Sequence, residues 1–332
     1  MNLRCSTVPF LALLVLGGNL APGAQTANRA DAGEEVDAAA ADAGAHIKPD
    51  RIVTYKTVGT VALGVSIFNP PGHRPGQPVA GIVFFHGGGF NIGAPSNFYA
   101  QAQYLASRGM VAISVEYRIR SRHQTTQREA VMDAMSAMRW VRQHTAELGI
   151  DPARLAVAGG SAGGFLAAAV TTLSGLDEPG EATATSTRPN ALVLFNSSLD
   201  RGPGSRAFAK VEAAMGDKWK TISPLHNLYP DFPPTIHFLG KSDKNVSVAS
   251  AQKMKAEIEK IGGRCDLHLY DGQEHGFFNY GRGDNTYYRA TLLETDKFLT
   301  SIGYLRGPPT LDATSSQRAH LPIDGRDRSL DR

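Results

Sequence analysis

A glycine-rich turn at Gly159–Gly164 (GGSAGG) constrains this chain more than any other feature of its sequence. It follows a short apolar run, Leu155–Ala158, and leads into an Ala-rich segment, Gly163–Leu173, with helical character. A strand, a tight turn and a helix around Gly-x-Ser-x-Gly form the context of a nucleophile elbow, with Ser161 as the nucleophile. An ordinary glycine turn is the alternative. A phosphate-binding loop is disfavoured because no Lys follows and the Gly-x-Gly-x-x-Gly spacing is absent.

Short apolar runs alternate with longer amphipathic segments on both sides of this turn. The clearest helical pattern covers Glu129–Leu148, with Gly149 and Pro152 just beyond its end. The other runs with strand character are Val61–Phe68, Val79–Phe85, Met110–Val115, Ala191–Phe195, Ile236–Leu239 and Leu267–Tyr270. The other helical candidates are Asn97–Ser107, Ser247–Ile261 and Tyr287–Ser301. This alternation predicts the α/β class, with a mostly parallel sheet covered by helices on both faces.

A second glycine loop, His86–Phe90 (HGGGF), follows the strand predicted at Val79–Phe85. Its three glycines allow the backbone to approach a substrate and to aim N–H groups at one point, although a merely flexible loop is the alternative. In an elbow, such N–H groups join that of the residue after the nucleophile, here Ala162, to hold an oxyanion. We expect His86 to hold the loop, because a base ahead of Ser161 breaks the expected chain order of Ser, acid and His.

The acid and the base of a serine nucleophile are therefore expected after Ser161, each directly after a strand. Asp243 follows the strand predicted at Ile236–Leu239, and His275 follows the one at Leu267–Tyr270. In this arrangement His275 takes the proton from Ser161 and returns it to the leaving group. Asp243 fixes the tautomer of His275 and stabilises its protonated form.

Other acidic and imidazole side chains compete for these roles. Asp200 follows the strand predicted at Ala191–Phe195 and is an alternative acid. Asp271 and Glu274 lie close to His275 in sequence and are interpreted as loop or rim residues. Several later histidines lack a glycine loop directly after a strand, namely His226, His237, His268 and His320.

The two ends of the chain differ in composition from the 332-residue whole, which is 42% hydrophobic and can build one large core over residues 51–305. Arg4, the apolar stretch Val8–Leu16 and a small-residue zone ending near Ala30 predict a signal peptide at residues 1–27. Residues 28–50, rich in Ala and Asp, and residues 306–332 predict a disordered linker and tail. We therefore expect a secreted or periplasmic protein.

Charge and cysteine content exclude several classes of partner. The net charge of +3, without a basic run interleaved with aromatics, argues against nucleic acid. The N-terminal apolar stretch is too short to span a bilayer, so no stable membrane insertion is expected after its removal. Cys265 would be the single cysteine of the mature chain and is interpreted as a small strand hydrophobe. No metal-ligand spacing is present, and we expect no catalytic metal or cofactor.

Together these motifs resemble the hormone-sensitive-lipase-like branch of the α/β-hydrolases and its bacterial esterase relatives, over about Ile52–Leu305. Glu116–Arg118 and Trp140 also lie where that family has a Tyr-Arg strand end and the helix after it. The resemblance implies the α/β-hydrolase fold and cofactor-free ester hydrolysis. It also implies a triad of Ser161, Asp243 and His275, with oxyanion donors at Gly88, Gly89 and Ala162.

Two features depart from the family pattern. Many members have an acidic residue before the nucleophile, whereas Gly160 here is more similar to exported bacterial esterases and acetylxylan-esterase-like proteins. Members with lids often carry helices ahead of the first strand, where this chain has its Ala/Asp-rich linker, so an open mouth is expected. Lid or pocket material is available within Asn196–Pro234, although packing on the sheet is an equal alternative for its large side chains, Phe208, Trp219, Leu225 and Tyr229.

The sequence thus predicts a serine ester hydrolase that acts through an acyl-enzyme on short, acetyl-type esters, with carbohydrate esters as candidate substrates. An amidase or peptidase with the same triad, such as an aryl-formamide hydrolase, is the alternative within the fold. A non-catalytic binding protein is the alternative from another class. That interpretation requires a lost triad member, and the sequence retains all three candidates.

Overall fold

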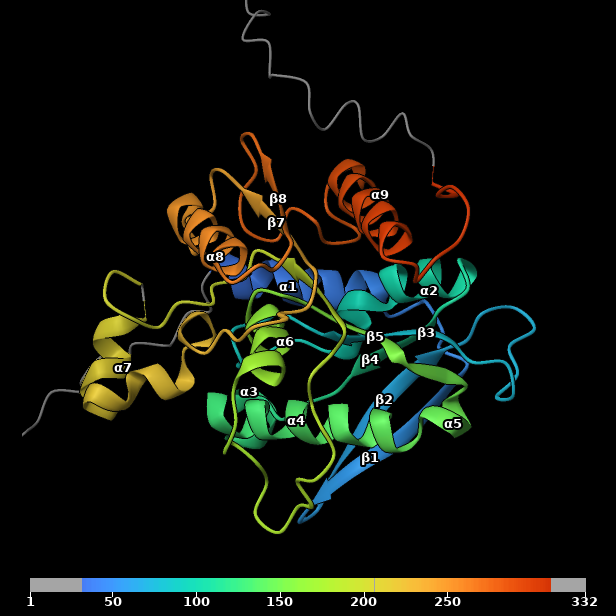
Figure 1. The fold of residues 1–332 in the computed structure, drawn as a ribbon, viewed down its shortest axis with the longest axis horizontal. Helices are drawn as coiled ribbons and strands as arrows, with labels where there is room; N and C mark the ends of the chain where they lie inside the picture. Colours follow the sequence, from blue (N-terminus) through green and yellow to red (C-terminus); the bar gives the residue numbers. More distant parts are fainter. Residues whose placement is uncertain (1–31, 206, 312–332) are drawn as a thin grey trace, which may run out of the picture. The chain divides into compact units, whose positions relative to one another are not determined.

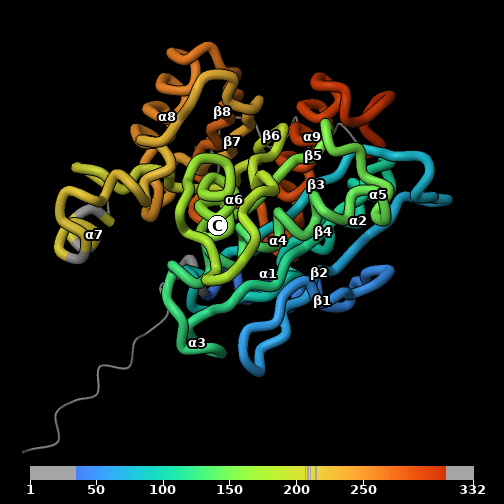
Figure 2. Tube along the Cα trace, turned by 60° about the horizontal axis from the view of Figure 1, so that its bottom comes forward, coloured from blue at the N-terminus to red at the C-terminus, as the bar shows by residue number. Residues whose placement is uncertain are grey.

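Eight strands form one sheet in the computed structural model, which describes residues 32–205 and 207–311. Their order is β1-β2-β4-β3-β5-β6-β7-β8, and Figure 2 shows β1 and β2 at one edge and β8 at the other. β2 pairs antiparallel with both of its neighbours, and all other pairs are parallel, which confirms the predicted fold class. The strands are β1 Arg51–Val58, β2 Val61–Phe68, β3 Val79–Phe85, β4 Val111–Val115, β5 Ile150–Gly160, β6 Ala191–Phe195, β7 Thr235–Gly240 and β8 Cys265–Tyr270.

Helices cover both faces of this sheet (Figure 1). Side chains of β3 alternate between the two faces, so that Val83 and Phe85 join one apolar core while Ile82 and Phe84 join the other. Residues of α4, α5, α6 and α8 contribute to the first core, and residues of α2 and α9 to the second. These helices are α2 Tyr99–Ser107, α4 Gln127–Gln143, α5 Thr145–Leu148, α6 Ala162–Thr172, α8 Val248–Lys260 and α9 Thr286–Ser301.

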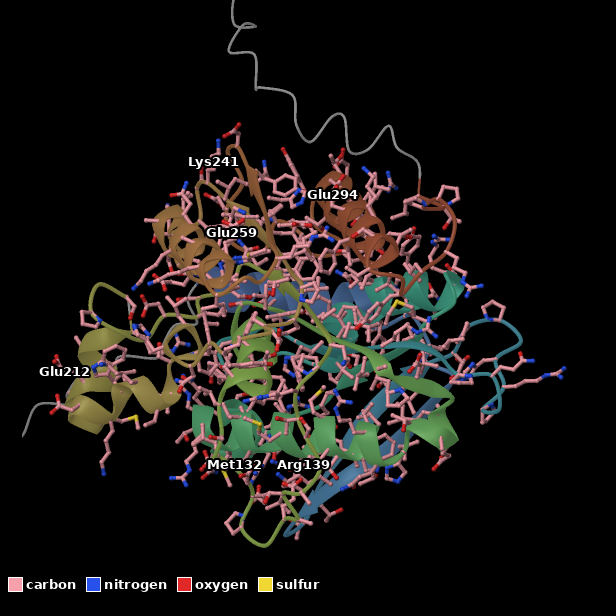
Figure 3. The ribbon with its side chains drawn as sticks, viewed as in Figure 1. Met132, Arg139, Glu212, Lys241, Glu259 and Glu294 are labelled. Atoms are coloured by element: carbon pink, nitrogen blue, oxygen red, sulfur yellow. The ribbon has the colours of Figure 1, made fainter. Side chains whose placement is uncertain are left out.

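Helix α4 shows how local sequence sets an element and fixes it to its surroundings. It begins with a capping box in which Thr126 accepts from the Arg128 N–H and Glu129 accepts from the Thr126 N–H. Along the helix, Arg139, labelled in Figure 3, pairs with Asp177 over 2.5 Å. The helix ends at Gln143 rather than continuing to Leu148 as predicted, and the short helix α5 follows it.

The segment Ala32–Gly44 forms helix α1, so the prediction of a disordered linker over residues 28–50 is wrong for this part. Its small side chains allow close packing, with Ala40 and Ala41 buried. The 3-10 helix η1 (Pro95–Phe98) lies against it, and Ser96 Oγ donates to the Ala41 carbonyl over 2.7 Å. Composition alone does not reveal this helix, because its stability comes from contacts that are distant in sequence rather than from large apolar side chains.

The other segments outside the predicted core elements are strand β1 and the two ends of the chain. Strand β1 was not expected, because most of its side chains are exposed or half-buried and give no clear alternation. At the start of the predicted tail, Arg108, which directly follows α2, donates to the carbonyls of Arg306 and Gly307. The predicted signal peptide and the predicted tail beyond residue 311 lie outside the described residues. Within the described part, no helix is long and apolar enough to cross a membrane.

The excursion between β6 and β7 contains α7 (Phe208–Met215) and the 3-10 helices η2 (Gly216–Ile222) and η3 (Pro224–His226). Leu225 is buried in the first core and Tyr229 packs against it, which favours the packing role over the pocket role for these two residues. The Trp219 ring packs edge-on against the His226 ring, with centroids 4.7 Å apart. The side chain of Phe208 is outside the described set.

Candidate active site

Ser161 sits between the end of β5 at Gly160 and the start of α6 at Ala162, with φ 51° and ψ −116°. Such a left-handed conformation is strained for a residue with a side chain and is typical of functional sites. The turn closes only because its neighbours lack side chains: a Cβ on Gly163 would lie 2.0 Å from the Phe85 carbonyl oxygen. A Cβ on Gly160 would lie 2.5 Å from Phe278 Cζ, so the acidic residue of many relatives does not fit here.

The three predicted triad residues come together in one hydrogen-bonded chain. Ser161 Oγ lies 2.9 Å from His275 Nε2, and His275 Nδ1 lies 2.8 Å from Asp243 Oδ2. Asp243 follows β7 and His275 follows β8, so both lie beyond the carboxyl ends of parallel strands, as does Ser161. This is the geometry in which an imidazole removes a proton from a serine hydroxyl while a carboxylate orients the ring.

The carboxylate of Asp243 is fully buried but has donors on both oxygens. Burial alone would raise the pKa of Asp243. The hydrogen bond and charge of His275, the Val246 N–H and the Asn196 amide together hold that pKa below its ordinary value. Asp243 is therefore ionised wherever His275 needs a charged partner.

The rival acids are engaged elsewhere. Asp200 binds Lys253 over 2.8 Å and accepts from the Gly202 N–H over 2.7 Å. Asp271, just after β8, forms an exposed ion pair with Lys241, just after β7. Glu274 lies 3.7 Å from Arg282, an exposed contact. Asp243 is thus the acidic residue that the structure places within hydrogen-bond distance of the His275 ring.

His86 holds the glycine loop His86–Phe90, called the oxyanion loop below, in place, as expected from its position in the sequence. Its ring stacks on Tyr117 with centroids 4.1 Å apart, and the Tyr117 hydroxyl donates to the His86 carbonyl over 2.7 Å. His86 Nδ1 lies 2.7 Å from the Gly87 carbonyl. Burial lowers the pKa of His86 to about 3, so the ring is neutral and is not a competing base.

One of the predicted oxyanion donors has a hydrogen-bond partner within the protein. The Gly88 N–H donates to Asp37 Oδ2 over 2.8 Å. Within the described part of the chain, the N–H groups of Gly89 and Ala162 have no acceptor. The donor roles of Gly88, Gly89 and Ala162 toward an oxyanion stay predictions. Sequence reasoning missed Asp37 because no motif surrounds it.

The other candidate reactive groups are structural. His237 is buried, its Nε2 lies 3.3 Å from the Ser197 nitrogen, and burial lowers its pKa to about 4. Burial raises the pKa of Cys265 to about 12, which agrees with a strand hydrophobe rather than a nucleophile. His320 lies outside the described residues. Among the residues that the structure describes, no three His, Cys, Asp or Glu side chains are placed to hold a metal ion.

Known proteins share both the fold and the site region. A protein-family model described as alpha/beta hydrolase fold matches residues 82–210. The structure is similar to the apo form of Thermogutta terrifontis esterase 2, with a TM-score of 0.74 and 40% identity, over 79% of this chain and 97% of that chain. The chain belongs to the α/β-hydrolase family. The predicted resemblance to the esterases of its hormone-sensitive-lipase-like branch is confirmed with it.

Curated α/β-hydrolase relatives match over shorter segments. Carboxylesterase NlhH of Mycobacterium tuberculosis is 36% identical over 131 residues, which cover 38% of this chain and 40% of the relative. Ethyl acetate hydrolase of Pseudomonas putida is 36% identical over 106 residues, 32% of this chain and 33% of the relative. The chain thus spans less than half the length of these two relatives.

Proposed function

We propose that this α/β-hydrolase is a serine carboxylic ester hydrolase that acts through an acyl-enzyme. The observation that carries the proposal is the continuous chain from Ser161 Oγ through His275 to Asp243, with contacts of 2.9 and 2.8 Å. A site that only binds ligands has no need of this alignment, because each member serves the transfer of one proton. The names of the carboxylesterase and esterase relatives support the same reaction class.

In the first half of the reaction, Ser161 Oγ attacks the ester carbonyl carbon and its proton passes to His275 Nε2. The oxyanion accepts hydrogen bonds from the N–H groups of the predicted donors Gly88, Gly89 and Ala162. The bond to the alkoxy oxygen then breaks, and His275 returns the proton to the leaving alcohol. In the second half, water repeats the sequence on the acyl-enzyme and releases the acid and free Ser161.

We also propose that the acyl group is short. Thermogutta terrifontis esterase 2, at 40% identity, was solved with propionate and with butyrate bound. The relative from Pseudomonas putida is named an ethyl acetate hydrolase. Both names point to acyl chains of two to four carbons, and the predicted acetyl-type substrate falls in this class.

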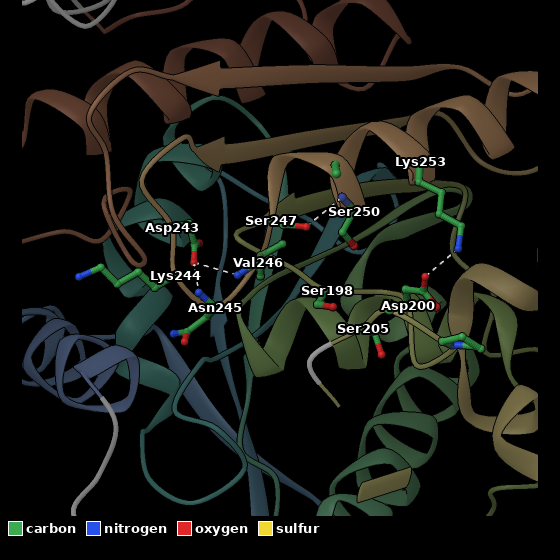
Figure 4. Close-up of a pocket in the computed structure, with 13 residues that line it drawn as sticks. Ser198, Asp200, Ser205, Asp243, Lys244, Asn245, Val246, Ser247, Ser250 and Lys253 are labelled. Atoms are coloured by element: carbon green, nitrogen blue, oxygen red, sulfur yellow. Dashed lines mark hydrogen bonds and ion pairs between the residues drawn. The ribbon is translucent and has the colours of Figure 1, made fainter. Parts of the chain in front are cut away.

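For the alcohol part we propose a polar group such as a sugar. A cavity of about 480 Å³ lies between α8 and the loop after β6 (Figure 4); Asp243 lines it, whereas Ser161 and His275 are not among its lining residues. Hydroxyl, amide and charged side chains line much of it, including Ser198, Ser205, Asn245, Ser250 and Lys253. Such a lining suits the many hydroxyl groups of a carbohydrate better than an aliphatic alcohol.

We further propose that the protein is exported. The support is the order of Arg4, the apolar stretch Val8–Leu16 and the small residues up to Ala30, which is the order of a secretory signal. Mass measurement of the protein recovered from culture medium or periplasm tests this. A mature N-terminus between Ala21 and Ala30 is expected, and an intact Met1 or a cytoplasmic location would contradict export.

The reaction class is tested with a panel of acetyl, butyryl and longer-chain esters, acetylated xylan, and acetanilide and formanilide as amides. Wild type is expected to cleave the short esters fastest. Ser161→Ala should lower kcat by at least about 10⁴-fold. Ser107→Ala, at the exposed end of α2, serves as the matched control and should keep wild-type rates. Activity that survives in Ser161→Ala would overturn the mechanism, and cleavage of amides alone would overturn the ester class.

The polar cavity is tested with Ser250→Val, which removes a hydroxyl from its wall and fills part of its volume. We expect kcat/KM on an acetylated sugar to fall about fivefold, the cost of one neutral hydrogen bond, while that on p-nitrophenyl acetate stays unchanged. Equal loss on both substrates, or no loss on either, would contradict the assignment of the sugar to this cavity.

A further inference from the structure

The guanidinium of Arg201 has no hydrogen bond or ion pair among the residues that the structure describes. The side chain is half-buried, and burial lowers the pKa of Arg201 to about 10. The adjacent carboxylate of Asp200 binds Lys253 Nζ over 2.8 Å (Figure 4) and accepts from the Gly202 N–H over 2.7 Å. A buried charge is costly unless it is paired, so the fold holds Arg201 without the compensation that such a group normally has.

Two other arginines with little exposed surface each have an acid as partner. Arg108 lies 2.7 Å from Asp296, and Arg118 lies 2.8 Å from Asp133. Both ion pairs join segments that are distant in the sequence or in different elements, and they stabilise the fold in this way. The guanidinium of Arg201 joins its loop to no acidic side chain of the described residues.

Three contacts place Arg201 near the nucleophile. Arg201 Cζ lies over the Phe165 ring, 4.1 Å from its centroid. Phe165 is one helical turn beyond Ser161, and its N–H donates to the Ser161 carbonyl over 3.1 Å. Phe90, the last residue of the oxyanion loop, packs edge-on against the same ring with centroids 6.0 Å apart. The cation therefore lies against a ring that contacts both the turn of Ser161 and the oxyanion loop.

Consecutive side chains of the loop after β6 face different helices. Asp200 binds Lys253 of α8 and lines the polar cavity beside that helix. Arg201 contacts Phe165 of α6 and is not among the residues that line this cavity. The cation thus belongs to the surroundings of the nucleophile rather than to the cavity beside α8.

We propose that Arg201 binds an anionic group, of the carboxylate type, on the ester that Ser161 attacks. The proposal rests on the proposed ester hydrolase function and names a substrate class for it. A guanidinium presents N–H donors in a planar fork that matches the two oxygens of a carboxylate. The contact with Phe165 stabilises the cation through the face of the ring and leaves those donors for the substrate.

Two matched pairs of esters test the proposal and show which part of the substrate carries the anion. Methyl hydrogen succinate has a carboxylate on the acyl part, and methyl isocaproate has an isopropyl group of the same shape in its place. Acetoxyacetate has a carboxylate on the alcohol part, and isobutyl acetate is its neutral counterpart. Wild type should favour the anionic member of one pair by about tenfold or more in kcat/KM, as expected for a hydrogen bond between charged groups.

Arg201→Met removes the charge but keeps an unbranched apolar chain against Phe165. The anionic preference, taken as the ratio of kcat/KM within a pair, should fall about 10- to 100-fold in this variant. Arg201→Lys keeps the charge without the fork and should give an intermediate ratio. Arg188→Met is the matched control, because Arg188 Cζ also lies over an aromatic ring, that of Tyr229 at 3.9 Å, but precedes β6 at the other end of the parallel strands. The control should keep the wild-type ratio.

Urea unfolding separates this role from a purely structural one. No carboxylate loses a hydrogen-bonded partner in Arg201→Met, so its unfolding midpoint should not fall below that of wild type. A lowered midpoint with an unchanged ratio would assign Arg201 to packing on Phe165 and overturn the proposal. If Arg201→Met does not fold, the same comparison on Arg201→Gln decides.

The failure of this proposal can be told apart from the failure of the proposed function. A wild type that cleaves p-nitrophenyl acetate but favours the neutral member of both pairs overturns the role of Arg201 alone. An unchanged ratio in the folded Arg201 variants has the same consequence. A wild type that cleaves no ester overturns the proposed function and this proposal together.

Discussion

Asn196 Nδ2 donates to Asp243 Oδ2 over 2.6 Å, and this is the same oxygen that His275 Nδ1 contacts. Asn196 directly follows β6 and has φ 48°, a left-handed conformation that Asn tolerates better than most residues. The amide therefore reaches the triad from a neighbouring strand end and fixes the oxygen on which His275 depends. Asn196 is a second contributor to the site that the motifs did not reveal.

Replacing this amide should disturb the triad without removing any of its members. In Asn196→Asp a carboxylate faces Asp243 across 2.6 Å, and two carboxylates at that distance repel or share a proton. We expect kcat on an acetate ester to fall about tenfold or more, as for a lost partner of a buried charged group. Asn285→Asp, at a left-handed Asn whose side chain accepts from the Gly281 N–H rather than contacting the triad, should keep wild-type kcat. Equal rates in the two variants would contradict the role of Asn196.

The choice of Asp243 over Asp200 as the acid is open to a direct comparison. Asp243→Asn should lower kcat about 10⁴-fold, because the ring of His275 loses both its orienting acceptor and the charge that stabilises its protonated form. Asp200→Asn loses its contacts with Lys253 and His226 as a charged partner, neither of which touches the triad, and should stay within about threefold of wild type. Steady-state rates at neutral pH measure both variants, and the opposite ranking would assign the acid to Asp200.

Below neutral pH, the dependence of activity on pH should report the protonation of a single group, His275. The pKa of Asp243 is held below its ordinary value of 3.8, so this carboxylate stays charged as pH falls from 7 to about 4. Protonated His275 cannot accept the Ser161 proton. As pH falls, kcat/KM should therefore decrease with the slope of a single protonation. Rates between pH 4 and 9 test this. A two-proton limb above pH 4, or no fall at all, would contradict the assignment of the base.

The sequence predicted the parallel part of the sheet well for a physical reason. β3 and β6 match the predicted runs residue for residue, because a strand that is buried on both faces leaves a continuous apolar run. The triad was found from the same pattern, since each member directly follows such a strand. This apolar pattern is missing in two elements. Strand β1, at the edge of the sheet, is half-exposed, and helix α1 is built from Ala and acidic residues whose contacts lie more than 50 residues away in the sequence.

The oxyanion loop shows the same limit at the level of single groups. The motif His86–Phe90 was sufficient to predict a cluster of N–H donors, but not which of them is free. Gly88 is engaged by Asp37, 51 positions earlier in the chain, and no spacing rule connects the two residues. Long-range hydrogen bonds of this kind require the fold before they can be inferred.

Two buried neutral histidines should make the protein sensitive to acid. Burial lowers the pKa of His237 to about 4 and that of His86 to about 3, whereas both bind protons from pH 6.5 downward when unfolded. The unfolded state therefore takes up more protons in this window, and stability is lost as pH falls from 6.5 toward 3. For His237 the loss amounts to the order of 3 kcal/mol, since one pKa unit corresponds to about 1.4 kcal/mol.

Urea unfolding at pH 7 and pH 5 measures this effect. His237→Asn keeps an acceptor for the Ser197 N–H but does not titrate, so the difference in unfolding free energy between the two pH values should shrink. His46→Asn changes an exposed histidine on the surface and should leave the wild-type difference in place. A difference that is the same in all three proteins would show that His237 does not carry the acid sensitivity.

The central claim is that Ser161 is the nucleophile, and covalent labelling with paraoxon tests it most directly. Thermogutta terrifontis esterase 2 was solved in a form phosphorylated by this compound. We expect one diethyl phosphoryl group per chain, located on Ser161 by peptide mass mapping, with loss of ester hydrolysis in proportion to labelling and no adduct in Ser161→Ala. Labelling of another residue that tracks the loss of activity, or full inhibition with Ser161 unmodified, would contradict the account.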